Sequence, residues 1–333
     1  MMNKRLKQGT TFLLALALAF PLLTLSGARA ANAIETDRKC SVSFSVSGED
    51  NELTADGTNI TVNLYKVADV DVSGNYTATE DFTGVDVSSV RADNNDAASE
   101  WVERAKKAKE KLSDSVKPVA TVTLIRGIGA KAGLDTGLYL VDTPEVVTTN
   151  YTYTFTPYLV SLPTNNYYSS GNDDWIYNLT DTNAIGLKPE EHARYGDLVI
   201  NKTLENHNAT TGKKATFVFQ IKIKPLKSNK TETRIESLDF EAAGESSVTI
   251  TKIPAGAEVT VKEVYSGASY KLTSADDQRA TIVATDRGAT NTPASVSFTN
   301  DINNNMNGGY GVKNNFKLDE NGQYQYTEPA EKN

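Results

Sequence analysis

Three polar residues in the last third of the chain have types that can react with one another. Lys202 lies in DLVINKTL, Glu263 in VTVKEVY and Asn300 in VSFTND. Each of these runs alternates apolar and polar residues, which is typical of a β-strand with one buried face. The runs are far apart in sequence. Their polar residues can therefore meet only if a first, a middle and a last strand of one sandwich lie close together.

Burial would give these residues complementary reactivity. It disfavours the ammonium form of Lys202, which lowers the lysine pKa and makes a neutral, nucleophilic amine accessible. It also raises the carboxyl pKa of Glu263, so that a protonated acid can polarise the Asn300 carbonyl and pass a proton to the leaving ammonia. The product is a Lys–Asn amide, formed once per molecule without a cofactor. The alternative is that Lys202 and Glu263 are exposed strand residues and Asn300 belongs to a turn.

Strand-like runs also recur along the rest of the chain, separated by turn signals such as Ser73-Gly74-Asn75 and Asp135-Thr136-Gly137. The runs are SVSFSV, NITVNLYKV, GLYLV, YTYTFTPYLVSL, ATFVFQIKI, SSVTITKI, AEVTVKEV and ASVSFTN. This frequency favours an all-β protein with two tandem immunoglobulin-like β-sandwich domains.

One segment has a different pattern. Residues 96–116 (DAASEWVERAKKAKEKLSDSV) hold helix formers and lack Gly and Pro. They place Ala98, Trp101, Val102, Ala105 and Ala108 at helical spacing. We predict a helix inserted in the first domain, covering a sheet edge.

The domain organisation follows from composition and length. We expect a first domain over residues 31–195 and a second over 196–302, with a boundary in the polar run KPEEHARY. A C-terminal extension over 303–333 is Asn- and Gly-rich and carries a hairpin signal at Glu320-Asn321-Gly322.

The first 30 residues have the pattern of a secretory signal peptide. A basic start is followed by an apolar stretch from Thr11 to Leu25 and by the small-residue pattern Ala28-Arg29-Ala30, with Ala33 as an alternative cleavage position. No second apolar stretch of spanning length follows, so we expect no transmembrane segment after signal cleavage. We expect a secreted, extracellular protein.

Charge and cysteine content narrow the function classes. The net charge of −8 becomes roughly −12 once the signal peptide is removed. An acidic exported chain lacks the basic patches that phosphate recognition needs, so no nucleic-acid partner is expected. Cys40 is the one cysteine, which excludes an intramolecular disulfide framework, and we interpret it as an ordinary strand residue.

The stretch from Asp197 to Asn300 resembles the Cna protein B-type domain of Gram-positive pilins and adhesins. The matching runs are DLVINKTL, TFVFQIKI, SSVTITKIPAGAEVTVKEVYSGASYKLTS and VSFTND. In that family the lysine of the first strand bonds to the asparagine of the terminal FTN, and the glutamate of the VxE strand catalyses the reaction. The resemblance therefore implies a Lys202–Asn300 crosslink with Glu263 as its catalyst.

The first domain is similar to the N-terminal domain of backbone pilins, through NITVNLYKVADVD, GLYLV, YTFTPYLVSLP and WIYNLT. The resemblance implies partners: other pilin subunits and a sortase that joins them. Lys188 in IGLKPEE lies where such pilins carry the lysine that accepts the next subunit. Lys66 and Asn178 are candidates for a second internal crosslink, with Asp142 or Glu145 as its acid. The alternative for Lys66 is an exposed strand lysine.

Backbone pilins end with an LPxTG-type sorting signal, an apolar helix and a basic tail, whereas this sequence ends YTEPAEKN. Polymerisation through this C-terminus is therefore not expected of the sequence as it stands. A truncated product and a related secreted protein that stays outside covalent fibres are both compatible with it.

Two other function classes remain open. A surface adhesin would use its aromatic residues to bind a host glycan or matrix protein. The aromatic cluster in question is Tyr151, Tyr153, Phe155, Tyr158, Tyr167, Tyr168 and Trp175.

A carbohydrate-active enzyme would need facing carboxylates, for which Asp173-Asp174 and Glu190-Glu191 are the candidates. His192 and His207 lack metal-ligand spacing, so we predict no metal and no cofactor. Beyond single-turnover crosslinking, we expect no enzyme activity.

Overall fold

The computed structural model of the protein describes residues 32–46, 52–88, 97–165, 174–180, 184–208, 214–304, 315–318, 320 and 323–327. Strands dominate these ranges, and the predicted all-β class is confirmed. The signal peptide predicted over residues 1–30 lies outside the described residues. No helix of the described part is long and apolar enough to cross a membrane.

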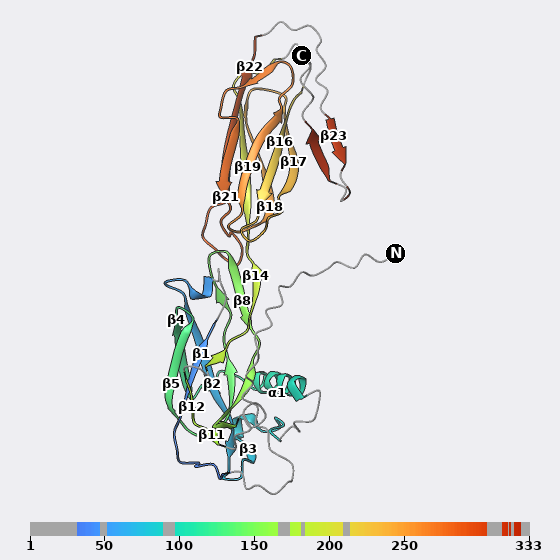
Figure 1. The fold of residues 1–333 in the computed structure, drawn as a ribbon. Coiled ribbons are helices and arrows are strands. Elements are labelled where there is room, and N and C mark those ends of the chain that lie inside the picture. Colours follow the sequence, from blue (N-terminus) through green and yellow to red (C-terminus); the bar gives the residue numbers. More distant parts are fainter. Residues whose placement is uncertain are drawn as a thin grey trace. The chain divides into compact units, whose positions relative to one another are not determined.

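The chain divides into two compact units (Figure 1). The first consists of Met1–Val146 and Tyr153–Glu190, and the second of Val147–Thr152 and Glu191–Asn333. The chain therefore passes between the units three times, because a short mid-chain segment packs with the second unit.

A nine-stranded sheet forms the first unit, with the path β12-β1-β5-β4-β2-β6-β9, while β13 pairs with β1 and β3 with β2. Its strands are β1 (Cys40–Ser45), β2 (Asn59–Val70), β3 (Tyr76–Ala78), β4 (Ala120–Ile125), β5 (Ile128–Leu134), β6 (Gly137–Asp142), β9 (Tyr158–Leu162), β12 (Asn178–Leu179) and β13 (Ile185–Gly186). The unit also contains two 3-10 helices, η1 (Glu52–Thr54) and η2 (Glu80–Phe82). Two further short strands, β10 (Thr164–Asn165) and β11 (Trp175–Ile176), pair with each other.

The predicted helix is present as α1 (Ala97–Glu110). Its buried residues Trp101, Ala105 and Ala108 recur at helical spacing and pack in a core that includes Leu138 and Leu159. The helix ends before the predicted limit of 116, because Ser113-Asp114-Ser115 favours turns over a further helical turn. Helix α1 contacts β9, the last strand on the sheet path, and the adjacent β6.

A separate three-stranded sheet has the order β14-β8-β7. Its strands are β7 (Val146–Val147), β8 (Tyr151–Phe155) and β14 (Pro189–Ala193). The run KPEEHARY, expected to be a linker, thus contributes the strand β14.

The second unit is built on two four-stranded sheets, β18-β15-β22-β20 and β17-β16-β19-β21 (Figure 1). The strands are β15 (Tyr195–Leu204), β16 (Ala215–Lys224), β17 (Glu232–Phe240), β18 (Gly244–Pro254), β19 (Glu258–Tyr265), β20 (Tyr270–Leu272), β21 (Asp277–Thr281) and β22 (Ala294–Ile302). Every neighbouring pair is antiparallel except β15 and β22, the first and last strands, which run parallel.

Aromatic and branched side chains from both sheets fill the core of this unit, including Phe217, Phe219 and Phe298. The rings of Phe219 and Phe298 lie 5.2 Å apart, and Phe217 contacts both Phe240 and Tyr270. Near the C-terminus, β23 (Asn315–Leu318) and β24 (Tyr324–Thr327) pair as the antiparallel hairpin that the turn signal indicated.

Candidate functional site

Strand alternation directs the three polar residues inward. On β15, Lys202 is in phase with the buried Leu198, Ile200 and Leu204. On β19, Glu263 follows the buried Val259 and Val261 by the same two-residue step, and on β22 Asn300 follows Val296 and Phe298. Because side chains alternate between the faces of a sheet, each polar residue occupies a core position.

The sheet order brings the three strands together. Strands β15 and β22 are adjacent and parallel, with Leu204 opposite Asn300 in the register. Strand β19 belongs to the facing sheet. Lys202 and Asn300 therefore come from neighbouring strands of one sheet, and Glu263 reaches them from across the core.

The resulting site is a buried triplet of Lys202, Glu263 and Asn300, with exposed fractions of 1%, 8% and 0%. Nδ2 of Asn300 donates a hydrogen bond to Oε1 of Glu263 at 2.6 Å. The second carboxyl oxygen, Oε2, lies 3.9 Å from Nζ of Lys202. One oxygen of Glu263 thus faces the asparagine and the other faces the lysine.

The lysine amine lies in a largely apolar environment. Its Nζ donates to the backbone carbonyl of Thr203 at 2.9 Å and lies 4.4 Å from the centre of the Phe217 ring. The remaining polar groups of the triplet are not fully satisfied, because Oε2 of Glu263 and Oδ1 of Asn300 are buried without a hydrogen bond. A buried polar group without a partner carries a desolvation cost of about 1–3 kcal/mol.

Burial dominates the electrostatics of the pair. It lowers the pKa of Lys202 from 10.5 to about 8, against the opposing influence of the Glu263 and Glu205 charges. It raises the pKa of Glu263 from 4.5 to about 7, against the hydrogen bond from Asn300 and the charge of Lys202. Both shifts favour the neutral forms, a free amine and a protonated acid.

This arrangement can support acyl transfer between side chains. A neutral amine is a nucleophile, and a carboxyl group that contacts both nitrogens can exchange protons with each of them. A rigid sandwich holds the groups in contact and so provides a high effective concentration.

The residues proposed for a second crosslink do not meet in this way. Lys66 on β2 forms an ion pair with Asp69 at 2.5 Å, and Asp142 on β6 forms one with Lys109 of α1 at 2.7 Å. Asn178 on β12 is exposed and accepts a hydrogen bond from Thr180. Among the described contacts none joins Lys66, Asn178 and Asp142, so a first-unit crosslink stays a prediction that these contacts do not support.

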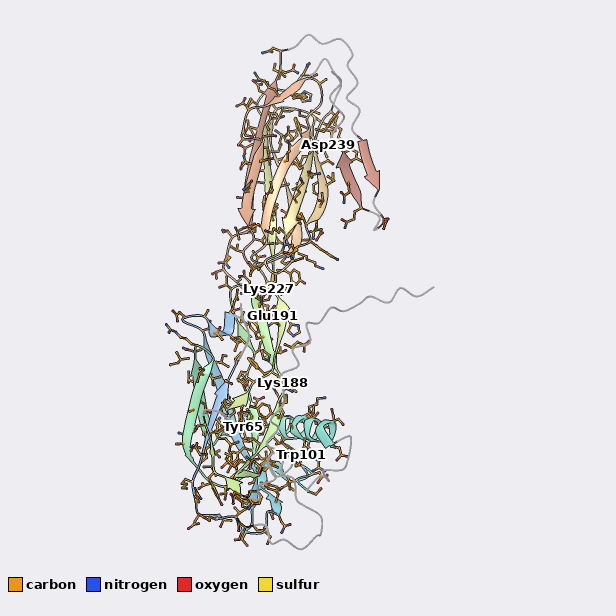
Figure 2. All side chains as sticks on the ribbon, in the orientation of Figure 1. Tyr65, Trp101, Lys188, Glu191, Lys227 and Asp239 are labelled. Atoms are coloured by element: carbon orange, nitrogen blue, oxygen red, sulfur yellow. The ribbon has the colours of Figure 1, made fainter. Side chains whose placement is uncertain are left out.

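Lys188, which Figure 2 labels, is exposed and immediately precedes β14. An exposed lysine can reach a partner, so its role as an acceptor of another subunit remains a prediction.

The aromatic residues considered for an adhesin are mostly internal. Tyr151, Tyr153 and Phe155 on β8 are buried. Trp175 is half-buried, and its indole donates to the backbone of Asn32 at 2.6 Å. Tyr158 is also half-buried, whereas Tyr167 and Tyr168 lie outside the described residues. The described members of the cluster thus form no exposed aromatic face.

The candidates for other chemistry do not form a site. Glu190 and Glu191 are exposed on β14, Asp174 is exposed, and Asp173 lies outside the described residues. The part of the chain that the structure describes contains no group of three metal-ligating side chains, and His192 and His207 lie in no such group.

Cys40 is buried in β1 as a free thiol, as expected for a strand residue.

Two features of the second unit had no sequence signal. The ring of Phe217 over the Lys202 amine follows from packing between the two sheets, which a strand pattern does not specify. Arg194 is 9% exposed although it lies in a polar run, and it binds Asp286 across 92 positions of sequence.

Comparison with protein families and known structures gives limited similarity. A family model described as "Domain of unknown function (DUF5979)" matches residues 198–303, the stretch that carries the triplet. No curated protein matches the chain.

Solved structures similar to the chain include GBS52, the minor pilin of Streptococcus agalactiae, and the full-length major pilin SpaD of Corynebacterium diphtheriae. Each is 12% identical, and each match covers 82% of this chain and 100% of the other, with TM-scores of 0.24 and 0.26. The Bacillus anthracis TIE protein is 12% identical over 86% of this chain and 40% of its own, with a TM-score of 0.30.

Proposed function

We propose that the protein is a structural subunit of a Gram-positive surface pilus or stalk, stabilised by an amide bond between Lys202 and Asn300. The observation that carries this proposal is the buried triplet, in which one carboxyl group contacts both prospective partners of the bond. Other subunits, and a sortase that joins them through Lys188, are the partners that belong to this proposal. We place the mature protein outside the cell.

The proposed reaction needs no component beyond the triplet. The neutral amine of Lys202 attacks the side-chain carbonyl carbon of Asn300, and a new bond to Nζ forms. Glu263, protonated at the start, gives its proton to Nδ2, the leaving nitrogen, and takes one back from the attacking nitrogen. The bond from that carbon to Nδ2 then breaks and ammonia departs. Glu263 ends the reaction in its starting form, so each molecule reacts once.

Several contacts support this sequence of steps. The leaving nitrogen already lies 2.6 Å from the carboxyl oxygen that would protonate it. Burial moves the pKa of Lys202 and of Glu263 toward the neutral forms that the reaction uses. The amide also removes the ammonium group from the core, where a charge without full hydrogen bonding is costly.

Intact mass of the purified protein tests the bond. We expect the wild type to be lighter than its sequence by one ammonia, and tryptic digestion to give a branched peptide that joins Lys202 to Asn300. The variants Glu263→Gln and Lys202→Met should have the full mass of their sequences.

The matched controls change exposed residues beside the triplet on two of the same strands. Lys262→Met on β19 and Asn201→Ser on β15 should both retain the mass loss, because these side chains point away from the core. A wild-type mass equal to the sequence would refute the crosslink and favour an adhesin that functions without it. A mass loss that persists in Glu263→Gln would remove the catalytic role of Glu263.

A further inference from the structure

A second group of buried polar contacts lies in the second unit and centres on Arg194. Nε of Arg194 donates to Oδ1 of Asp286 at 3.0 Å, and Nη1 donates to the backbone carbonyl of Thr148 at 2.8 Å. The other oxygen of Asp286 accepts from the backbone N–H of Tyr195 at 3.1 Å. Eight residues of extended chain, about 25 Å, separate Arg194 from Lys202, so this group is distinct from the triplet.

Backbone contacts add to those of the side chain. The N–H of Arg194 donates to the carbonyl of Asn150, and the carbonyl of Arg194 accepts from Ala255, each at 2.9 Å. At Gly256 an added Cβ would lie 2.9 Å from the side-chain oxygen of Asn150. Gly256 also has a φ of 77°, so a side chain is disfavoured there on both counts.

A third contact secures the end of the same segment. Nζ of Lys227 lies 4.4 Å from the centre of the Tyr151 ring and 2.6 Å from a carboxyl oxygen of Glu191. Figure 2 labels Lys227 and Glu191 next to one another. Every residue in these contacts belongs to the second unit, although Thr148, Asn150 and Tyr151 precede most of it in sequence.

The chemistry of Arg194 explains why the segment matters to the second unit. A guanidinium group remains charged at all ordinary pH values, so its burial requires hydrogen-bond acceptors. Asp286 provides the opposite charge, and Thr148 of the mid-chain segment supplies a backbone acceptor. Removal of the segment would leave part of a buried cation without its partner.

We propose that Arg194 binds the segment Val147–Thr152 into the second unit, so that this segment opens with the second unit and not with the first. The Arg194 anchor consists of Arg194, Asp286 and the backbone of Thr148 and Asn150. It makes the passage between the units a folded part of one of them rather than a free linker. This inference depends on neither the crosslink nor a role in a pilus.

Hydrogen exchange on the full chain tests the proposal without altering the anchor. The variant Trp101→Ala weakens the core of the first unit, since Trp101 is 3% exposed there. We expect it to speed exchange at Leu140 of β6 and to leave the amides of Thr148 and Arg194 as protected as in the wild type. If those two amides lose protection together with Leu140, the proposal is wrong. If Trp101→Ala prevents the first unit from folding, the amides of Thr148 and Arg194 should still be protected, so the test applies in that case too.

A second measurement removes the anchor itself. In Arg194→Ala we expect exchange at Thr148 and Tyr195 to become at least about tenfold faster, while the protection of the β16 amides stays unchanged. The matched control is Arg234→Ala in the same unit, where Arg234 binds Glu232 and the carbonyl of Thr251. Unchanged exchange at Thr148 in Arg194→Ala, or an equal rise in the control, would overturn the assignment.

Discussion

At the scale of single residues, burial and mutual attraction have opposite effects on the ionisation of Lys202 and Glu263. Burial drives Lys202 toward the free amine and Glu263 toward the protonated acid, although the two would attract each other as ions. The desolvation of both groups outweighs that attraction here, since their closest charged atoms are 3.9 Å apart. An uncrosslinked chain should therefore show the titration of Glu263 in its stability.

The variant Lys202→Met isolates that titration, because it cannot form the amide and keeps the buried carboxyl. With Lys202 in place the folded state holds the Glu263 proton up to a pKa of about 7, whereas the unfolded chain releases it near 4.5. The charge of Lys202 lowers this pKa, so its removal shifts the folded-state pKa further in the same direction. The unfolding free energy contributed by this group is greatest below pH 4.5 and falls by up to about 3 kcal/mol as the pH rises through 7. Urea unfolding between pH 4 and 8 measures the change.

The comparison for this pH effect is the double variant Lys202→Met, Glu263→Gln. It keeps the other titrating groups of the chain and should lack the fall attributed to Glu263. If the unfolding free energies of the two variants changed with pH in parallel, the raised pKa of Glu263 would be contradicted.

At the scale of elements, the start of β15 depends on a close approach between backbones. A Cβ at Gly196 would lie 1.8 Å from the carbonyl oxygen of Val283, so only glycine fits. This contact places the first residues of β15 against the segment that leads into β22. The position of Lys202 farther along β15 follows from it.

Replacement of Gly196 by alanine should therefore destabilise the second unit by about 1–3 kcal/mol or more, as overpacking does in other cores. Thermal unfolding followed by the protection of β16 amides would measure this. Gly186→Ala is the control, since nothing lies within 4 Å of an added Cβ there and little change is expected. Equal stability of the two variants would show that the backbone at Gly196 can move.

The helix α1 gives an independent prediction in the first unit. Trp101 is almost fully buried against the sheet, so Trp101→Ala should lower the unfolding free energy of this unit by about 3–5 kcal/mol. Lys107→Ala on the exposed face of the same helix should have little effect. Denaturant unfolding followed by far-UV circular dichroism, which does not rely on tryptophan fluorescence, distinguishes the two variants. Similar losses of unfolding free energy in both would place the helix outside the core.

At the scale of the whole molecule, the crosslink would close a loop from Lys202 to Asn300 within the second unit. A covalent link across about 100 residues reduces the entropy of the unfolded chain and stabilises the folded state by about 4.7 kcal/mol, as estimated for disulfides. Calorimetry should show that the second unit of Glu263→Gln unfolds at a lower temperature than that of the wild type. The unfolding transition of the first unit should be the same in both proteins. A uniform shift of both transitions would indicate an effect beyond the second unit.

Much of this arrangement could be predicted from local patterns. Alternation along the strands of Lys202, Glu263 and Asn300 indicates which face each side chain takes, and helical spacing predicts α1. Strand partners cannot be predicted in the same way, because alternation is the same whichever sheet a strand joins. For that reason the pairing of Lys66 with Asn178 stays a prediction, and the sequence carries no signal that places Val147–Thr152 in the second unit.

The parallel pairing of β15 with β22 has a mechanical consequence. The chain enters this pair at Tyr195 and leaves it at Ile302, at opposite ends of the two strands. Under tension applied to those ends, an amide between Lys202 and Asn300 would carry the load directly from one strand to the other. The strands from β16 to β21, which lie between the two bonded residues in sequence, would then carry no load and stay folded.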